Sequence, residues 1–147
     1  MDPVRIKRGI RKALKDLGYP EAELSLLFID DRGITELNRR YLKRDGPTNV
    51  LAFPMTDEAQ GELRTSMLGD IVICLDAALR DARAWGESLE TTVDRLIIHG
   101  LLHLLGYEHE GSTREALLME EETERLLGII TRSGAPPSDP ENDHEVE

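Results

Sequence analysis

The stretch Ile97–His109, IIHGLLHLLGYEH, decides both the fold and the chemistry of this chain. It holds three of the four histidines in the chain, and most of its other residues are apolar. His99 and His103 are four residues apart, so they stack on one face of a helix about one turn from each other. Gly106 can adopt the left-handed conformation that ends a helix, and a turn there can bring His109 back over the first two histidines.

Three imidazoles that converge from a helix and the loop after it suit a tetrahedral zinc ion. Zinc–nitrogen distances are about 2.0–2.1 Å, and three protein ligands leave the fourth position for water, as in catalytic zinc sites. A lone histidine on an apolar face is usually a core residue, but burying two unpaired imidazoles would cost a few kcal/mol. We therefore predict one Zn²⁺ per chain, bound by His99, His103 and His109.

The rest of the sequence predicts one zinc-hydrolase-like domain over residues 1–130. Apolar residues at helical spacing predict helices over 3–17, 33–44, 76–86 and 88–105, and another after residue 112. Compact apolar runs predict strands over 23–30, 48–55 and 67–75. This order fits an α+β fold or a three-layer α/β arrangement. We predict the α+β fold, a small mixed β-sheet flanked by helices, with the histidine-bearing helix buried at the centre.

The end of the chain has a different composition. From Thr131 the sequence is rich in proline, serine and acidic residues and has almost no apolar ones. Such a segment cannot bury enough apolar surface to fold. We therefore predict that residues 131–147 form a disordered acidic tail.

Charge is unevenly distributed along the chain. The net charge of −11 argues against binding of nucleic acid by charge alone. Residues 1–45 nevertheless hold 11 basic and 8 acidic side chains, so a small basic surface could face a polyanion. Aromatic residues are only 4% of the chain, which gives little support for base stacking.

Two further features bear on location and on the core. No apolar run approaches the roughly 18 residues of a membrane span, and a single cysteine cannot form an intramolecular disulfide, so we expect a cytoplasmic protein.

Cys74 alternates with Val72 in a predicted strand and is expected to fill the core. Asp70 interrupts the same strand, where we expect it to make structural hydrogen bonds.

The histidine spacing also matches the metzincin peptidase signature H-E-x-x-H-x-x-G-x-x-H. The residue after the first histidine is Gly100, however, and not the glutamate that acts as the general base of those peptidases. The pattern keeps the metal ligands and argues against peptide hydrolysis by that route.

Three segments resemble motifs of the YbeY family, bacterial rRNA maturation factors described as single-strand-specific, metal-dependent endoribonucleases. HGLLHLLGYEH (99–109) is similar to the family's H-G-x-L-H-L-x-G-Y-D-H, PTNVLAFP (47–54) to P-T-N/D-V-L-S-F-P, and MLGDIVI (67–73) to L-L-G-D-I-V-I. The segments follow the family's order and span essentially the whole domain. The resemblance implies a small mixed sheet flanked by helices and zinc bound by His99, His103 and His109.

The chain departs from the family pattern at three positions. Glu108 stands where the family has aspartate, and Ala52 stands where it has the serine of VLSF. Leu42 follows the tyrosine after which members commonly carry an arginine thought important for activity. Three nearby arginines could supply that charge instead, namely Arg39, Arg40 and Arg44.

We name Glu108 and Arg44 as the candidate catalytic residues. Glu108 and Glu110 are the glutamates nearest to the predicted metal ligands, so either could act as general base, orient a histidine or face solvent. The attacking group could be zinc-bound water or the 2′-OH of the RNA.

The resemblance implies a zinc-dependent single-strand-specific endoribonuclease that matures ribosomal RNA, at the 3′ end of small-subunit 16S rRNA, and acts in ribosome quality control. It implies single-stranded or ribosomal RNA as substrate and the ribosome or small-subunit-associated proteins as partners, with neither membrane nor DNA. Two alternatives stay open. The absence of the family arginine at Leu42 leaves a non-catalytic, zinc-stabilised ribosome-assembly factor, and the histidine spacing leaves a metallopeptidase.

Overall fold

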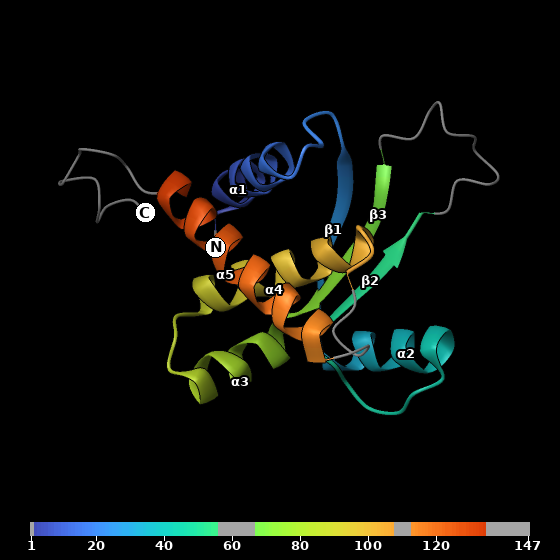
Figure 1. Cartoon of the computed structure of the whole chain (residues 1–147). Coiled ribbons are helices and arrows are strands. Elements are labelled where there is room, and N and C mark those ends of the chain that lie inside the picture. Colours follow the sequence, from blue (N-terminus) through green and yellow to red (C-terminus); the bar gives the residue numbers. More distant parts are fainter. Residues whose placement is uncertain (1, 56–66, 108–112, 135–147) are drawn as a thin grey trace.

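The computed structural model describes residues 2–55, 67–107 and 113–134 of the chain (Figure 1). The elements in these ranges follow in the order α1 (Pro3–Asp16), β1 (Glu23–Ile29), α2 (Asp31–Leu42), β2 (Val50–Pro54), β3 (Met67–Cys74), α3 (Leu75–Trp85), α4 (Leu89–Leu104) and α5 (Thr113–Gly134). This order confirms the predicted α+β fold. Within the described ranges, no helix has the length and apolarity needed to cross a bilayer.

The three strands form one mixed sheet in the order β1-β3-β2. β1 pairs with β3 in parallel and β2 pairs with β3 antiparallel, so β3 is the central strand. Its side chains alternate between the two faces, with Ile71 and Ile73 on one side and Val72 and Cys74 on the other. All four are buried, as the continuous apolar run predicted.

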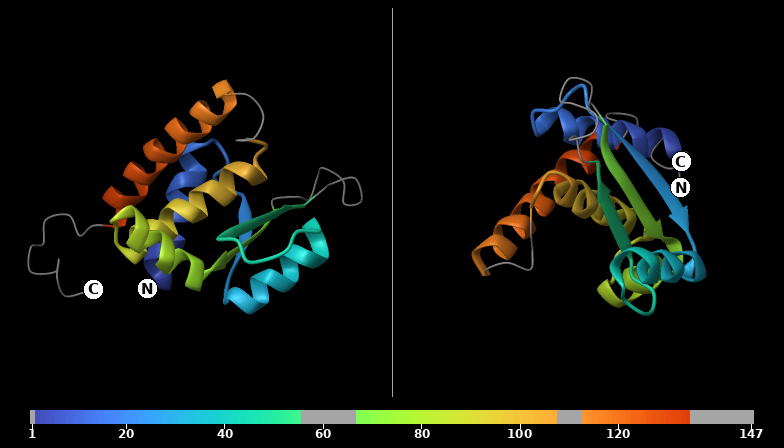
Figure 2. Two further views of the ribbon diagram at one scale, coloured as in Figure 1. Left: turned by 90° about the horizontal axis from the view of Figure 1, so that it is seen from below. Right: turned by 90° about the vertical axis from the view of Figure 1, so that its right-hand side faces the viewer.

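Helices α1, α4 and α5 gather on one face of the sheet (Figure 1, Figure 2). α4 lies between the sheet and α5, and from Leu96 onward it is apolar nearly all round. Ser88 begins this helix, because its hydroxyl oxygen accepts a hydrogen bond of 3.0 Å from the backbone N–H of Thr91. Its buried side chains are the centre of the main core, and they include Val93, Leu96, Ile97, Ile98, Leu101 and Leu102.

Helix α2 packs on the opposite face of the sheet. Its Ile34 is fully buried against a smaller core that includes Val72 and Cys74. Asp30 caps the start of the helix, and Lys43 ends it in the left-handed conformation, with φ 58°. The helix is therefore too short to cover the whole of this face.

Helix α5 continues to Gly134, beyond the predicted domain boundary at residue 130. The helix therefore includes the first four residues of the predicted tail over 131–147, residues 135–147 lie outside the described ranges, and the domain boundary stays a prediction. Ile130 is buried against α1, where a Cβ on Gly9 would lie 2.9 Å from it. The Thr131 hydroxyl donates a hydrogen bond of 2.7 Å to the carbonyl of Leu127, one turn earlier in the same helix.

A buried ion pair joins α1 to α4. The Arg5 guanidinium donates two hydrogen bonds to the Asp94 carboxylate, at 3.2 and 3.1 Å. The two side chains are only 17% and 8% exposed. Burial raises the pKa of Asp94 above its ordinary value, although Arg5 favours the charged form. The pair therefore fixes the packing of α1, but its carboxylate is held in an environment that disfavours its charge.

We predict that Arg5→Met lowers the free energy of unfolding by about 3 kcal/mol, because it leaves a buried carboxylate without a partner. Without Arg5 the pKa of Asp94 in the folded protein rises further above its value in the unfolded chain. The folded state then binds a proton more tightly than the unfolded state does, so the free energy of unfolding falls as the pH rises through the pKa of the folded state. Urea unfolding should therefore show that Arg5→Met loses more of the free energy of unfolding at about pH 8 than at about pH 5. Arg8→Met, on the exposed side of the same helix, should change stability little. An equal loss at both pH values would contradict this account.

Candidate functional site

His99 and His103 lie on one face of α4, near its C-terminal end, as predicted. Their ring centroids are 5.0 Å apart, with the ring planes at 71°. Both side chains are half-buried, so solvent can reach them from the open side of the helix. Two imidazoles on one tetrahedral zinc ion, each at about 2.0–2.1 Å, have ring centroids about 5 Å apart. The observed separation therefore fits two ligands of a single ion.

The chain turns sharply just after the second histidine. Gly106 has φ +101°, which confirms the predicted left-handed helix end. Its N–H donates a hydrogen bond of 3.0 Å to the carbonyl of His103, and the N–H of Tyr107 donates one of 2.9 Å to that of Leu102. This pair of bonds is the Schellman ending of a helix, and Tyr107 packs against the main core beside it.

The predicted third ligand lies beyond this turn. His109, Glu108 and Glu110 are all outside the described residues. The structure therefore brings together two of the three predicted ligands, and the placement of the third stays a prediction.

Gly100 supports the histidine pair from behind. It is buried, and a Cβ built on it would lie 2.9 Å from Cγ2 and 3.2 Å from Cδ1 of Ile71. The backbone of α4 therefore lies directly against β3, with no room for a side chain. A glutamate at this position, the peptidase general base, cannot fit in this fold, which argues against the metallopeptidase alternative on physical grounds.

Arg44 follows the end of α2 and is exposed. Its backbone N–H donates to the carbonyl of Asn38 at 3.3 Å, and its side chain has no partner among the described residues. The two other candidate arginines make long surface ion pairs, Arg39 with Asp45 at 3.8 Å and Arg40 with Glu36 at 3.9 Å. Arg44 is thus open to an external anion, but it does not contact the histidines.

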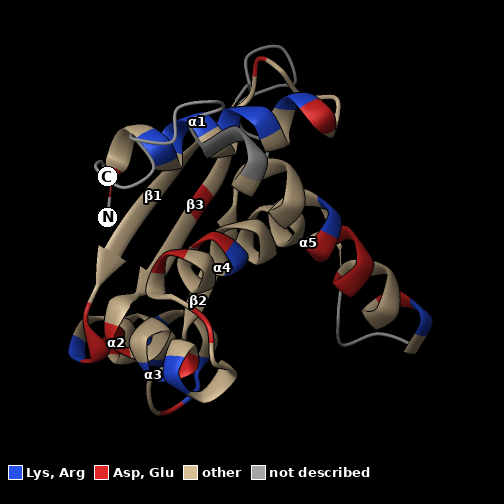
Figure 3. Ribbon diagram, turned by 90° about the vertical axis from the view of Figure 1, so that its left-hand side faces the viewer, with Lys and Arg blue, Asp and Glu red and all other residues tan. Residues whose placement is uncertain are grey.

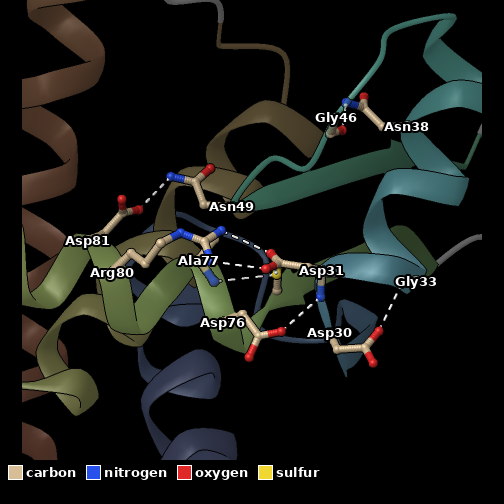
Figure 4. A network of polar contacts seen from close by, with 11 residues as sticks. Asp30, Asp31, Gly33, Asn38, Gly46, Asn49, Asp76, Ala77, Arg80 and Asp81 are labelled. Carbon is tan, nitrogen blue, oxygen red and sulfur yellow. Dashed lines mark hydrogen bonds and ion pairs between the residues drawn. The ribbon is translucent and has the colours of Figure 1, made fainter.

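A second group of metal-ligand types occurs where β1 and β3 end (Figure 4). Asp31, Cys74 and Asp76 present ligand atoms that all lie within 4.8 Å of one another. Asp31 follows β1 and Asp76 follows β3, and the carboxyl ends of parallel strands meet at one edge of a sheet. The sequence did not indicate this group, because no local pattern predicts that these two strands pair.

Hydrogen bonds within the chain already occupy that group. The Arg80 guanidinium donates two bonds of 2.9 Å to the Asp31 carboxylate, and the Cys74 thiol donates to it at 3.3 Å. The bond from Arg80 lowers the pKa of Asp31, and burial raises the pKa of the Cys74 thiol. A protonated thiol is a poor metal ligand, since the thiolate is the binding form. The arrangement is that of an ion-pair network.

Cys74 fills the core as predicted, with no exposed surface. It has a second role that its alternation with Val72 did not reveal. Its sulfur accepts a hydrogen bond of 3.4 Å from the N–H of Ala77, which caps the start of α3.

Comparison with known proteins assigns the family. The profile described as "Endoribonuclease YbeY" matches residues 3–131. The chain belongs to the YbeY family. Proteins named "Endoribonuclease YbeY" are similar to it in Geobacter metallireducens, at 40% identity over 88% of this chain and 87% of that one, and in Aquifex aeolicus, at 43% over 88% and 84%. A third, from Syntrophotalea carbinolica, is 44% identical over 85% of this chain and 84% of its own.

A solved structure supports the fold. A Thermotoga maritima protein studied in solution superposes with a TM-score of 0.63 and covers 92% of this chain and 90% of its own length. Its sequence identity is 24%, so this likeness bears on the fold alone.

We predict that Gly100→Ala lowers the free energy of unfolding by about 2 kcal/mol, because the added methyl group overpacks the contact with Ile71. The sign is opposite to the gain of about 1 kcal/mol that this change brings in an ordinary helix. Urea unfolding of both single variants and of Gly100→Ala/Ile71→Ala would measure the coupling. The free energy of unfolding of the double variant should fall by less than the sum of the two single losses. Losses that simply add would contradict the packing account.

Proposed function

We propose that this protein is a zinc-dependent endoribonuclease that cleaves single-stranded RNA in the maturation of ribosomal RNA. The family supports cleavage of RNA, since its members are named endoribonucleases. The observation that carries the assignment of the site is the pair of imidazoles 5.0 Å apart, on a buried helix that ends in a glycine turn. Burial of α4 holds the backbone that carries both rings, which favours a preformed pair of ligands.

His99, His103 and His109 would hold the zinc ion, which when bound lowers the pKa of its water and polarises a phosphoryl oxygen. The proton of the attacking group, either that water or the 2′-OH of the RNA, would pass to the carboxylate of Glu108. Arg44 would bind a phosphate of the substrate, because its guanidinium is exposed and has no partner among the described residues.

A basic helix face offers contacts for the RNA backbone. Five cations of α1 are exposed, and among the described residues none has an ion-pair partner: Lys7, Arg8, Arg11, Lys12 and Lys15. Figure 3 shows basic residues along α1 and acidic residues along α5. RNA would therefore be bound from the side of α1, through contacts that weaken with salt.

We further propose the ribosome, or proteins associated with its small subunit, as partners. The mostly acidic chain supports only a limited cationic surface for RNA. A partner that positions the rRNA would therefore supply much of the affinity and the choice of cleavage site.

The absence of the family arginine at Leu42 favours a second candidate function, a zinc-stabilised assembly factor without catalytic activity. In that case the ion would pin the segment after Gly106 to α4. Such a protein would bind zinc and associate with ribosomes, yet leave single-stranded RNA uncut at every metal concentration.

We predict that purified protein contains about one zinc per chain, and that His103→Ala loses both the zinc and the cleavage of a single-stranded RNA. Asp31→Asn is the matched control, because it alters the other group of ligand-type residues and should retain both. Elemental analysis and a gel assay, with and without chelator, would measure the two effects. Retention of zinc by His103→Ala together with its loss from Asp31→Asn would move the metal site to the Asp31 network.

A further inference from the structure

A pocket of about 410 Å³ opens on the face of the sheet opposite α4. Its lining comes from all three strands and from α2: Ser25, Leu27, Leu37, Tyr41, Phe53, Asp70 and Val72. None of these residues belongs to the candidate metal site or to the Asp31 network.

The strand register builds the floor of this pocket. Asp70 on the central strand lies opposite Ser25 of β1 and Phe53 of β2, so the three side chains form one row across the sheet. α2 covers the adjoining rows, but it ends at Leu42. The row through Asp70 is therefore left open to solvent.

The walls are aromatic and apolar. The rings of Tyr41 and Phe53 meet edge to face, with centroids 5.5 Å apart. Tyr41 of α2 is 56% exposed and Leu27 of β1 is 51% exposed, so both present apolar surface to solvent. Sequence composition gave little support for base stacking, but the fold brings two of the few aromatic residues together here.

Asp70 is the polar group of the pocket that stands out. The structural hydrogen bonds that we expected for it are absent, since its exposed carboxylate has no partner among the described residues. Both of its oxygens are free to accept hydrogen bonds from a ligand. The expectation failed because the side chain points outward, away from the face covered by α4.

A cation lies beside the aromatic wall of the pocket. The guanidinium carbon of Arg40 lies 6.0 Å from the centre of the Tyr41 ring. Its ion pair with Glu36 is a long surface contact of 3.9 Å. A cation at this wall and a carboxylate inside suit a ligand that is anionic at one end and donates hydrogen bonds at the other.

We infer that this pocket binds an unpaired guanine base of an RNA strand. The base would contact the Tyr41 and Phe53 rings, its N1–H and 2-amino group would donate to the two oxygens of Asp70, and Arg40 would bind an adjacent phosphate. This inference rests on the proposed function, because it names a part of the RNA substrate that the protein would recognise.

Base chemistry selects guanine over the other three. Guanine presents two adjacent donors on its Watson–Crick edge, which match the two acceptors of a carboxylate. Adenine and cytosine present one amino group beside a ring nitrogen that only accepts, and the single N3–H of uracil lies between two carbonyl oxygens. A basic peptide would also pair with Asp70, but Arg40 beside the Tyr41 ring would repel it.

The position of the pocket suits one RNA strand that reaches both sites. The histidines lie on the helix that covers one face of the sheet, and the pocket lies on the other face. β2 is an edge strand, so an RNA strand that passes around it contacts both faces. The recognised guanine would then lie several nucleotides from the scissile bond.

We predict that the protein binds an oligouridylate of about ten nucleotides roughly tenfold more tightly when it carries one central guanosine. Fluorescence anisotropy in the presence of a chelator would measure this preference without any cleavage. Inosine, which lacks the 2-amino group, should give an intermediate affinity. Asp70→Asn should remove most of the preference, whereas Glu120→Gln, an equal change of charge on the exposed side of α5, should keep it.

Equal affinity of the wild type for both oligonucleotides, or a preference that survives Asp70→Asn, would overturn the guanine assignment and leave the proposed cleavage standing. Binding of a triarginine peptide that Asp70→Asn abolishes, without any guanine preference, would overturn it in favour of a basic protein segment. Failure to bind either oligonucleotide would overturn the guanine assignment, and the cleavage assay with zinc present decides the proposed function separately. A guanine preference in a protein that cuts no RNA would support the pocket and overturn only the cleavage.

Discussion

The structure depends on the close approach of one helix backbone to the central strand. Gly100 has no side chain, so α4 lies directly on Ile71 of β3, and α3 and α5 pack against its other sides. Near the C-terminal end of this buried helix the side chains are only half-buried, and His99 and His103 are among them. The contact between Gly100 and Ile71 thus sets which side chains of α4 solvent can reach. The same contact leaves no room at position 100 for the glutamate of a peptidase.

Local patterns in the sequence predicted most of this architecture. Apolar spacing and capping residues predicted the order of helices and strands, and Gly106 marked the end of α4, because each of these signals acts within a few residues of chain. The pairing of β1 with β3 depends on residues more than 40 positions apart, so the Asp31–Cys74–Arg80 network was not predictable. The exposure of Asp70 was missed for the same reason, since only the register and the length of α2 leave its row uncovered.

The uneven charge of the chain shows how an acidic protein can accept RNA. Five exposed cations without an ion-pair partner among the described residues lie on α1, whereas α5 carries more acidic than basic residues (Figure 3). Association through such limited surfaces gives modest affinity and a shallow dependence on salt, compared with a protein that is basic overall. Low non-specific affinity has a physical consequence for a nuclease, because an enzyme that releases most RNA quickly cuts mainly where a partner or a recognised base prolongs the contact.

The edge strand β2 connects the two faces of the sheet. Phe53 points into the pocket beside Asp70, whereas Ala52, which pairs with Ile71, points toward the face that α4 covers. Leu104, in the last turn of α4, lies against Gly69 next to the carbonyl of Phe53, where any side chain on Gly69 would collide with that oxygen. A shift of β2 would therefore move the aromatic wall of the pocket and the end of the histidine-bearing helix together. Two sites on opposite faces are in this way held at a fixed spacing by one strand five residues long.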